Sequence, residues 1–140
     1  MRLGIDVDGV LGRVTAPGVV EPWRASQFLE DMITALLGRE GAHHRIFFIT
    51  ACCGADDIPE RFEALRQKHL DILGLHGLGS LVLTRYGEKG IICHGLSIDV
   101  FIDDQDDNLA DVARDSPQTV CLKFIGSVEQ ACVPRSDSEP

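Results

Sequence analysis

The sequence predicts an α/β protein with a three-layer, Rossmann-like fold: a five-stranded, mainly parallel sheet between helices, without a separate cap domain. Two observations lead to this prediction. Short apolar runs alternate along the chain with segments of helical periodicity, and several of these runs end in Asp or Thr. Strands that alternate with helices favour a parallel sheet covered on both faces. Ligands of such sheets bind beyond the carboxyl ends of the strands, where these polar residues are expected.

The individual elements follow from the local patterns. Apolar runs predict strands over residues 2–7, 45–50, 81–84, 98–102 and 119–125. Helical spacing predicts helices over residues 23–37, from an N-cap at Asp57 to Leu73, and over 88–96 and 108–114. Residues 9–22 contain three glycines and two prolines, so we expect turn and loop there.

Length and composition limit the possible classes. The 140 residues suffice for one domain with a real core. We expect this domain over residues 1–126, with a small flap and helix insert at about 10–40, and a C-terminal tail over 127–140 with a disordered end. The chain shows no membrane span and no signal-peptide pattern. Five cysteines without a regular framework indicate reduced thiols and a cytoplasmic protein.

The net charge of −9 argues against strong non-specific binding to nucleic acid or to an anionic membrane, although a local basic site would remain compatible with it. The acidic residues are unevenly distributed. Asp6 and Asp8 end the first strand, and seven aspartates lie between residues 99 and 115. A solvated acidic surface explains most of these seven. Asp103 and Asp104 directly follow a buried strand, however, and beside Asp6 and Asp8 they would form an all-oxygen site suited to Mg²⁺.

Four segments together carry a family resemblance. Gly4-Ile5-Asp6-Val7-Asp8-Gly9-Val10 resembles the first motif of the haloacid dehalogenase (HAD) superfamily, an apolar strand followed by Asp-x-Asp-Gly. Ile46 to Thr50 is similar to the second motif, Lys89 stands where the third motif has its lysine, and Val100-Phe101-Ile102-Asp103-Asp104 resembles the fourth. The resemblance spans residues 1–125. Asp-x-Asp-Gly also opens calcium loops, but an EF-hand would require Glu where this chain has Pro17.

The resemblance implies an enzyme, a Mg²⁺-dependent phosphatase that hydrolyses a phosphate monoester through an aspartyl-phosphate. Asp6 would be the nucleophile, and Asp8 would be the general acid and base. Asp6, the backbone carbonyl of Asp8, and Asp104 would bind the metal, with Asp103 as a ligand or behind one. Thr50 and Lys89 would contact the phosphoryl group, together with backbone groups of Val7, Gly9 and Ala51.

Other readings of these residues remain open. Thr50 could merely end its strand, and Lys89 could be an exposed helix lysine. Many relatives have a further acid four positions after the second aspartate of the fourth motif, where this chain has Asn108, so Asp107 or Asn108 could lie near the metal. Zinc is disfavoured because the cysteines and histidines, including Cys52, Cys53, Cys93 and His94, lack paired ligand spacing. His69 is expected to be a core or boundary histidine.

The substrate is left open by the sequence. Too few residues separate the motifs to form a cap, so the resemblance is to minimal, capless members, whose open sites tend to act on large substrates such as phosphorylated protein or polynucleotide ends. The acidic net charge weakens the polynucleotide option, and a nucleotide or another small phosphate ester remains open. A second subunit of the same chain could cover the open site. Two alternatives to hydrolysis also remain: phosphoryl transfer to an acceptor other than water, and a non-catalytic module that binds metal or phosphate.

Overall fold

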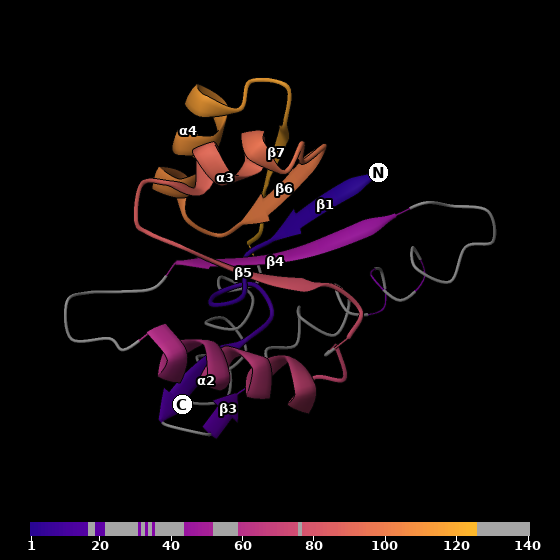
Figure 1. The fold of residues 1–140 in the computed structure, drawn as a ribbon, viewed down its shortest axis with the longest axis vertical. Coiled ribbons are helices and arrows are strands. Elements are labelled where there is room, and N and C mark those ends of the chain that lie inside the picture. The colour runs from indigo at the N-terminus through magenta and orange to yellow at the C-terminus, as the bar shows by residue number, and fades with distance from the viewer. Residues whose placement is uncertain are drawn as a thin grey trace, which may run out of the picture.

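A five-stranded parallel sheet forms the centre of the computed structural model, which describes residues 1–16, 19–21, 31, 33, 35, 44–51, 59–75 and 77–125. The strands lie in the order β5-β4-β1-β6-β7, and every neighbouring pair is parallel. Their bounds are β1 (Arg2–Ile5), β4 (Arg45–Ala51), β5 (Ser80–Thr84), β6 (Val100–Asp103) and β7 (Val120–Lys123). The predicted α/β class is therefore confirmed, and this sheet is parallel throughout (Figure 1).

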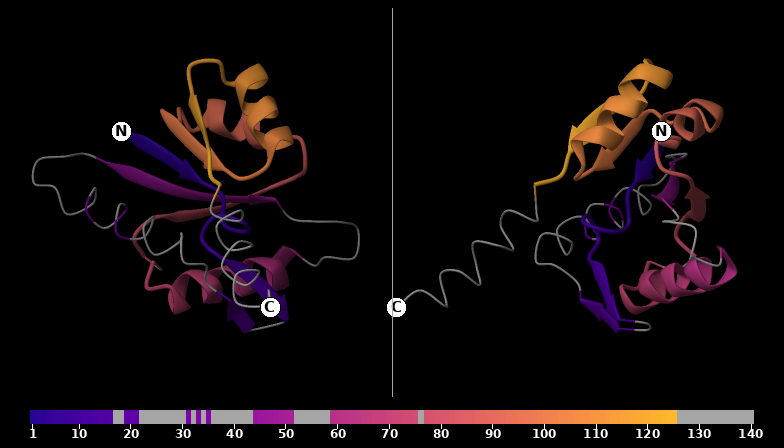
Figure 2. Two further views of the ribbon diagram at one scale, coloured as in Figure 1. Left: turned by 180° about the vertical axis from the view of Figure 1, so that it is seen from behind. Right: turned by 90° about the vertical axis from the view of Figure 1, so that its left-hand side faces the viewer.

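Helices lie on both faces of this sheet. In the described part of the chain these are α2 (Pro59–Ile72) on one face, and α3 (Lys89–Gly95) and α4 (Asp106–Asp115) on the other (Figures 1 and 2). The alternation of β4 explains the two layers, because Ile46 and Phe48 pack into one core while Phe47 and Ile49 pack into the second.

Each core joins the sheet to its own helices. The first contains Leu70 of α2 and the fully buried Ile33, together with side chains of β1, β4 and β6. The second contains Cys93 of α3 and Val112 of α4, packed on β4 and β6. Asp31, Ile33 and Ala35 are helical, whereas the rest of the helix expected over 23–37 lies outside the described residues. The C-terminal tail from residue 126 also lies outside them.

A second, two-stranded antiparallel sheet corrects the prediction of turn and loop over residues 9–22. It consists of β2 (Arg13–Ala16) and β3 (Val19–Glu21), with a register shift between Val14 and Ala16. Valines and one threonine dominate these two short segments, and β-branched residues favour strands. The glycines and prolines around these segments led instead to the prediction of a loop.

The face that α2 presents to the core follows the predicted one only in part. The apolar spacing predicts a stripe of Phe62, Leu65, His69, Ile72 and Leu73, and within it His69 is buried and Leu73 packs against the core, whereas Ile72 is 52% exposed. Arg66 and Leu70 are buried beside His69, at the i, i+3 and i+4 spacing of one helix face. Ile72 lies two residues beyond Leu70, which turns it away from that face. A buried arginine therefore comes to lie at the inner surface of α2.

Candidate active site

The three central strands bring their carboxyl ends together at one edge of the sheet. β1 lies between β4 and β6, with Ile5 opposite Phe48 on one side and opposite Ile102 on the other. Asp6 follows β1, and its backbone amide donates a 2.9 Å hydrogen bond to the Ile102 carbonyl. Asp103 ends β6 beside it. This register explains why acids far apart in the sequence meet at one point.

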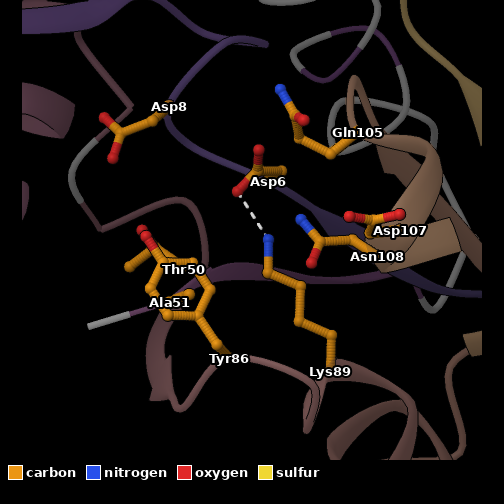
Figure 3. A pocket seen from close by; sticks show the side chains of 9 residues that line it. All are labelled: Asp6, Asp8, Thr50, Ala51, Tyr86, Lys89, Gln105, Asp107 and Asn108. Carbon is orange, nitrogen blue, oxygen red and sulfur yellow. Dashed lines mark hydrogen bonds and ion pairs between the residues drawn. The ribbon is translucent and has the colours of Figure 1, made fainter. Parts of the chain in front are cut away.

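Lys89 joins two of these acids. Its Nζ lies 2.7 Å from Asp6 Oδ1 (Figure 3) and 2.9 Å from Asp103 Oδ2, and the side chain is almost completely buried. Burial by itself lowers the pKa of Lys89, but the Asp6 and Asp103 charges and hydrogen bonds outweigh this effect and raise the pKa. Lys89 is therefore charged, and it is not the exposed helix lysine of the alternative reading.

Three carboxylates converge around this lysine. Asp6, Asp103 and Asp104 each offer an oxygen atom, and these atoms lie within 4.8 Å of one another. With all three ionised, the single Lys89 charge leaves a net charge of −2. Burial raises the pKa of Asp6 well above its usual value, against the effect of Lys89. Burial and the neighbouring Asp103 likewise raise the pKa of Asp104. The cluster of Asp6, Asp103 and Asp104 thus has three carboxyl groups and only one neighbouring cation among the described residues, Lys89.

Gly9 gives Asp104 the room that it occupies. A Cβ atom at this position would overlap the Asp104 carboxylate, and the Gly9 backbone has a φ of 88°, which side-chain-bearing residues rarely adopt. The Gly9 amide donates to the Gly12 carbonyl at 2.9 Å, and the Leu11 amide donates to the Val7 carbonyl at 3.0 Å. The turn after β1 is thus held by its own hydrogen bonds, with the Val7 side chain completely buried.

A pocket of about 310 Å³ opens beside the cluster (Figure 3). It brings together five of the residues expected from the sequence, since Asp6, Asp8, Thr50, Ala51 and Lys89 all line it. Thr50 is only 1% exposed, at the end of β4. The remaining lining residues are Tyr86, Gln105, Asp107 and Asn108. Val7 and Gly9 belong to the adjacent turn and are not among the residues described as lining the pocket.

The side chain of Asp8 points in another direction from that of Asp6. Figure 3 shows the two carboxylates directed apart. The Asp8 Oδ2 atom lies 2.6 Å from the Arg66 guanidinium of α2, and the Asp8 carboxylate is not one of the three that converge. Burial raises the pKa of Asp8, while the Arg66 charge and hydrogen bond oppose this rise. The sequence prediction omitted Arg66. Its place on the same helix face as His69 and Leu70 was the one signal that could have revealed it.

The residues around α4 divide into two groups. Asp107 and Asn108 line the pocket, where the sequence allowed for one of them near a metal. Asp106 pairs with Lys123 at 3.0 Å, and Asp111 and Asp115 pair with Arg114 at 3.4 and 2.9 Å. These surface pairs fit the reading of a solvated acidic helix. Tyr86 and Gln105 complete the pocket rim and were not predicted.

The thiols form no comparable centre among the residues that the structure describes. Cys93 is fully buried, and burial, with a contribution from Cys121, raises its pKa to about 12. Such a thiol is a poor nucleophile and a poor metal ligand. Cys52, Cys53 and His43 lie outside the described residues. Within the described part, the Asp6–Asp103–Asp104 group is the cluster of acids, histidines or cysteines with metal-binding geometry.

Comparison of the chain with protein-family models, with curated proteins and with solved structures finds no match. Within the described residues, no helix has both the length and the apolar character needed to cross a membrane. The functional argument therefore rests on the site itself. Asp6, Asp8, Thr50 and Lys89 line an open pocket, Asp103 is bonded to Lys89, Asp104 lies beside Asp6, and Arg66 is bonded to Asp8.

Proposed function

We propose that this chain is a Mg²⁺-dependent phosphatase of the HAD superfamily, which hydrolyses a phosphate monoester through a phosphoryl intermediate on Asp6. One observation carries the proposal: Lys89 bridges Asp6 and Asp103 at 2.7 and 2.9 Å, and a third carboxylate, that of Asp104, lies beside them. This arrangement supplies a fixed carboxylate nucleophile, a fixed cation and a place for a divalent metal ion.

The donor set fits a hard cation. All three acids offer oxygen atoms, which Mg²⁺ prefers, and Mg²⁺ is usually held by only a few carboxylates plus water and phosphate. Asp104 Oδ1 is buried with no hydrogen-bond partner among the described residues, so this oxygen still needs one. When bound, Mg²⁺ would offset the repulsion between the Asp6 carboxylate and an incoming phosphate.

The side chains of the pocket have complementary roles in this proposal. Asp6 attacks phosphorus, and Lys89 fixes its carboxylate while balancing charge on the transferring group. The Thr50 hydroxyl donates to a phosphoryl oxygen. Asp8 protonates the leaving oxygen and later takes a proton from the water that hydrolyses the intermediate. All four residues line the same pocket, as these roles require.

Hydrolysis of an aryl phosphate by the purified protein tests the proposal. We expect turnover with Mg²⁺ that is lost with EDTA. Asp6→Asn should lower kcat by about 1,000-fold or more, because the amide cannot form the intermediate. Asp71→Asn is a matched control, because Asp71 is an exposed α2 residue, and it should retain activity. Wild-type protein that is inactive on a broad panel of phosphate esters, or an Asp6→Asn variant as active as the wild type, would refute the proposal.

A further inference from the structure

The ion pair between Asp8 and Arg66 has no part in the roles described so far. The two residues are 58 positions apart in the chain, and the Arg66 nitrogen and Asp8 oxygen are 2.6 Å apart. The exposed fractions of the two side chains differ, at 9% for Arg66 and 38% for Asp8. The arginine is thus held in the protein interior, and the acid that it binds is partly exposed, although its Oδ1 atom is buried.

This pair determines where the Asp8 carboxylate points. Figure 3 shows it directed away from Lys89 and Asp6, although Asp8 is only two residues after Asp6. A charge-assisted hydrogen bond of this length to a buried guanidinium restrains both side-chain torsions of an aspartate. Arg66 is itself anchored, because α2 packs on the sheet through Leu70, one turn after it. The orientation of the acid is therefore set by α2 as well as by the turn after β1.

We propose that Arg66 is a positioning residue for Asp8, which holds its carboxyl group on the leaving-group side of the pocket. This inference rests on the proposed function, since it concerns the proton that Asp8 gives to the leaving oxygen. Proton transfer requires hydrogen-bond reach, and a displacement of about 1 Å can cost about 100-fold in rate. Without Arg66 the Asp8 side chain would sample other rotamers, and protonation of the leaving group would become less effective.

A series of substituted phenyl phosphates isolates this effect. The series keeps the shape of the substrate nearly constant while the leaving group varies from one that needs protonation to one that does not. The measured quantity is kcat/KM, which reports the steps up to formation of the intermediate. In Arg66→Gln, we expect kcat/KM to fall by about 10-fold to 100-fold for the poorest leaving group and by less than about 3-fold for nitrophenyl phosphate.

Further variants show whether Arg66 acts through Asp8. Asp8→Asn should steepen the dependence on the leaving group in the same way, and adding Arg66→Gln to it should steepen it no further. Arg66→Lys keeps a cation and should lie between the wild type and Arg66→Gln. Lys68→Gln, at an exposed position of the same helix, should match the wild type. Circular dichroism checks the fold of each variant. If Arg66→Gln does not fold, the leaving-group dependence of Arg66→Lys is compared with that of the wild type instead.

Two results would overturn this inference. An equal loss of kcat/KM for every leaving group would mean that Arg66 binds the substrate or supports the fold. An unchanged dependence on the leaving group in an active Arg66→Gln variant would mean that Asp8 does not need it. Both leave the proposed function intact, because the wild type is still active. Inactivity of the wild type on the whole series would overturn the proposed function and, with it, this inference.

Discussion

At the scale of single residues, Asp6 is the acid whose surroundings most oppose its charge. It is 5% exposed, and burial raises its pKa even though Lys89 lies 2.7 Å away. A bound divalent cation would counteract this effect, because it would place two positive charges beside the Asp6 carboxylate. The roles proposed for Asp6 and for the metal therefore depend on each other.

His69 gives a prediction that does not depend on catalysis. It is fully buried on α2, neither ring nitrogen has a hydrogen-bond partner among the described residues, and burial followed by the nearby Arg66 charge lowers its pKa to about 4. The unfolded chain, with a histidine pKa near 6.5, binds a proton first as the pH falls. The contribution of His69 to stability is thus complete above pH 6.5 and decreases between about pH 6.5 and pH 4.

The free energy of unfolding measured by urea titration checks this. From pH 7 to pH 5, His69 should account for a loss of about 2 kcal/mol. His69→Leu should lose that part of the pH dependence, whereas His94→Gln, at an exposed position, should retain it. Equal pH dependence in wild type and His69→Leu would contradict the assignment of His69 as a neutral core residue.

The predictability of the site differs from residue to residue. Asp6, Thr50 and Asp103 could be expected to converge, because each follows an apolar strand and parallel strands end at one edge. Arg66 was much harder to predict there. Its partner is 58 residues away, and an arginine on a helix is usually exposed. Tyr86 and Gln105 belong to the segments that follow β5 and β6, and no local pattern marks them as pocket residues.

At the scale of elements, the contact between α3 and α4 determines where Lys89 lies. A Cβ atom on Gly90 would overlap the backbone of Asp111 and come within 2.8 Å of the Asp115 side chain. The two helices can therefore approach this closely because residue 90 is glycine. Since Lys89 is the preceding residue, a shift of α3 would also move its Nζ away from Asp6 and Asp103.

Gly90→Ala should consequently destabilise the protein by about 1–3 kcal/mol, through overpacking, and should lower phosphatase activity in the fraction that remains folded. Gly95→Ala is the matched control on the same helix, because no atom lies within 4 Å of its added Cβ. It should change stability by no more than about 1 kcal/mol, in the stabilising direction. Thermal unfolding of both variants measures their stability relative to the wild type. A Gly90→Ala variant as stable as the wild type would argue against the tight α3–α4 contact.

The elements of the sheet were easier to predict than their surroundings. β4 is a continuous apolar run because both of its faces are buried, and this pattern identified it from the sequence. The β2–β3 pair was missed because its strands have only four and three residues and lie among glycines and prolines. The buried face of α2 was predicted only in part: His69 is buried as expected, but the apolar pattern did not indicate that Arg66 is buried beside it.

At the scale of the whole molecule, the order of the strands brings motifs that are far apart in the sequence together in one site. The order β5-β4-β1-β6-β7 places the first strand at the centre, flanked by the strands that supply Thr50 and Asp103. The alternation of strands and helices predicted the parallel sheet, but it did not determine this order, since several arrangements satisfy the same alternation. The order depends on packing between segments that are far apart in the chain.

The same arrangement leaves the pocket open at the sheet edge, lined by both acidic and neutral side chains. Lys89, the one basic residue among the described lining residues, is already bonded to two carboxylates. Under the proposed function, and with the net charge of −9, we therefore expect a substrate that brings one phosphate group with a metal ion rather than a polyanion.

Direct detection of the phosphorylated residue tests the role of Asp6 most sharply. Asp8→Asn protein, which keeps the nucleophile but hydrolyses the intermediate slowly, is mixed with nitrophenyl phosphate and Mg²⁺, quenched in acid, digested and analysed by mass spectrometry. We predict one phosphoryl group on the peptide that contains Asp6, lost with EDTA and in the Asp6→Asn/Asp8→Asn double variant. A phosphoryl group on any other residue, or none while the wild type turns over the same substrate, would contradict the mechanism.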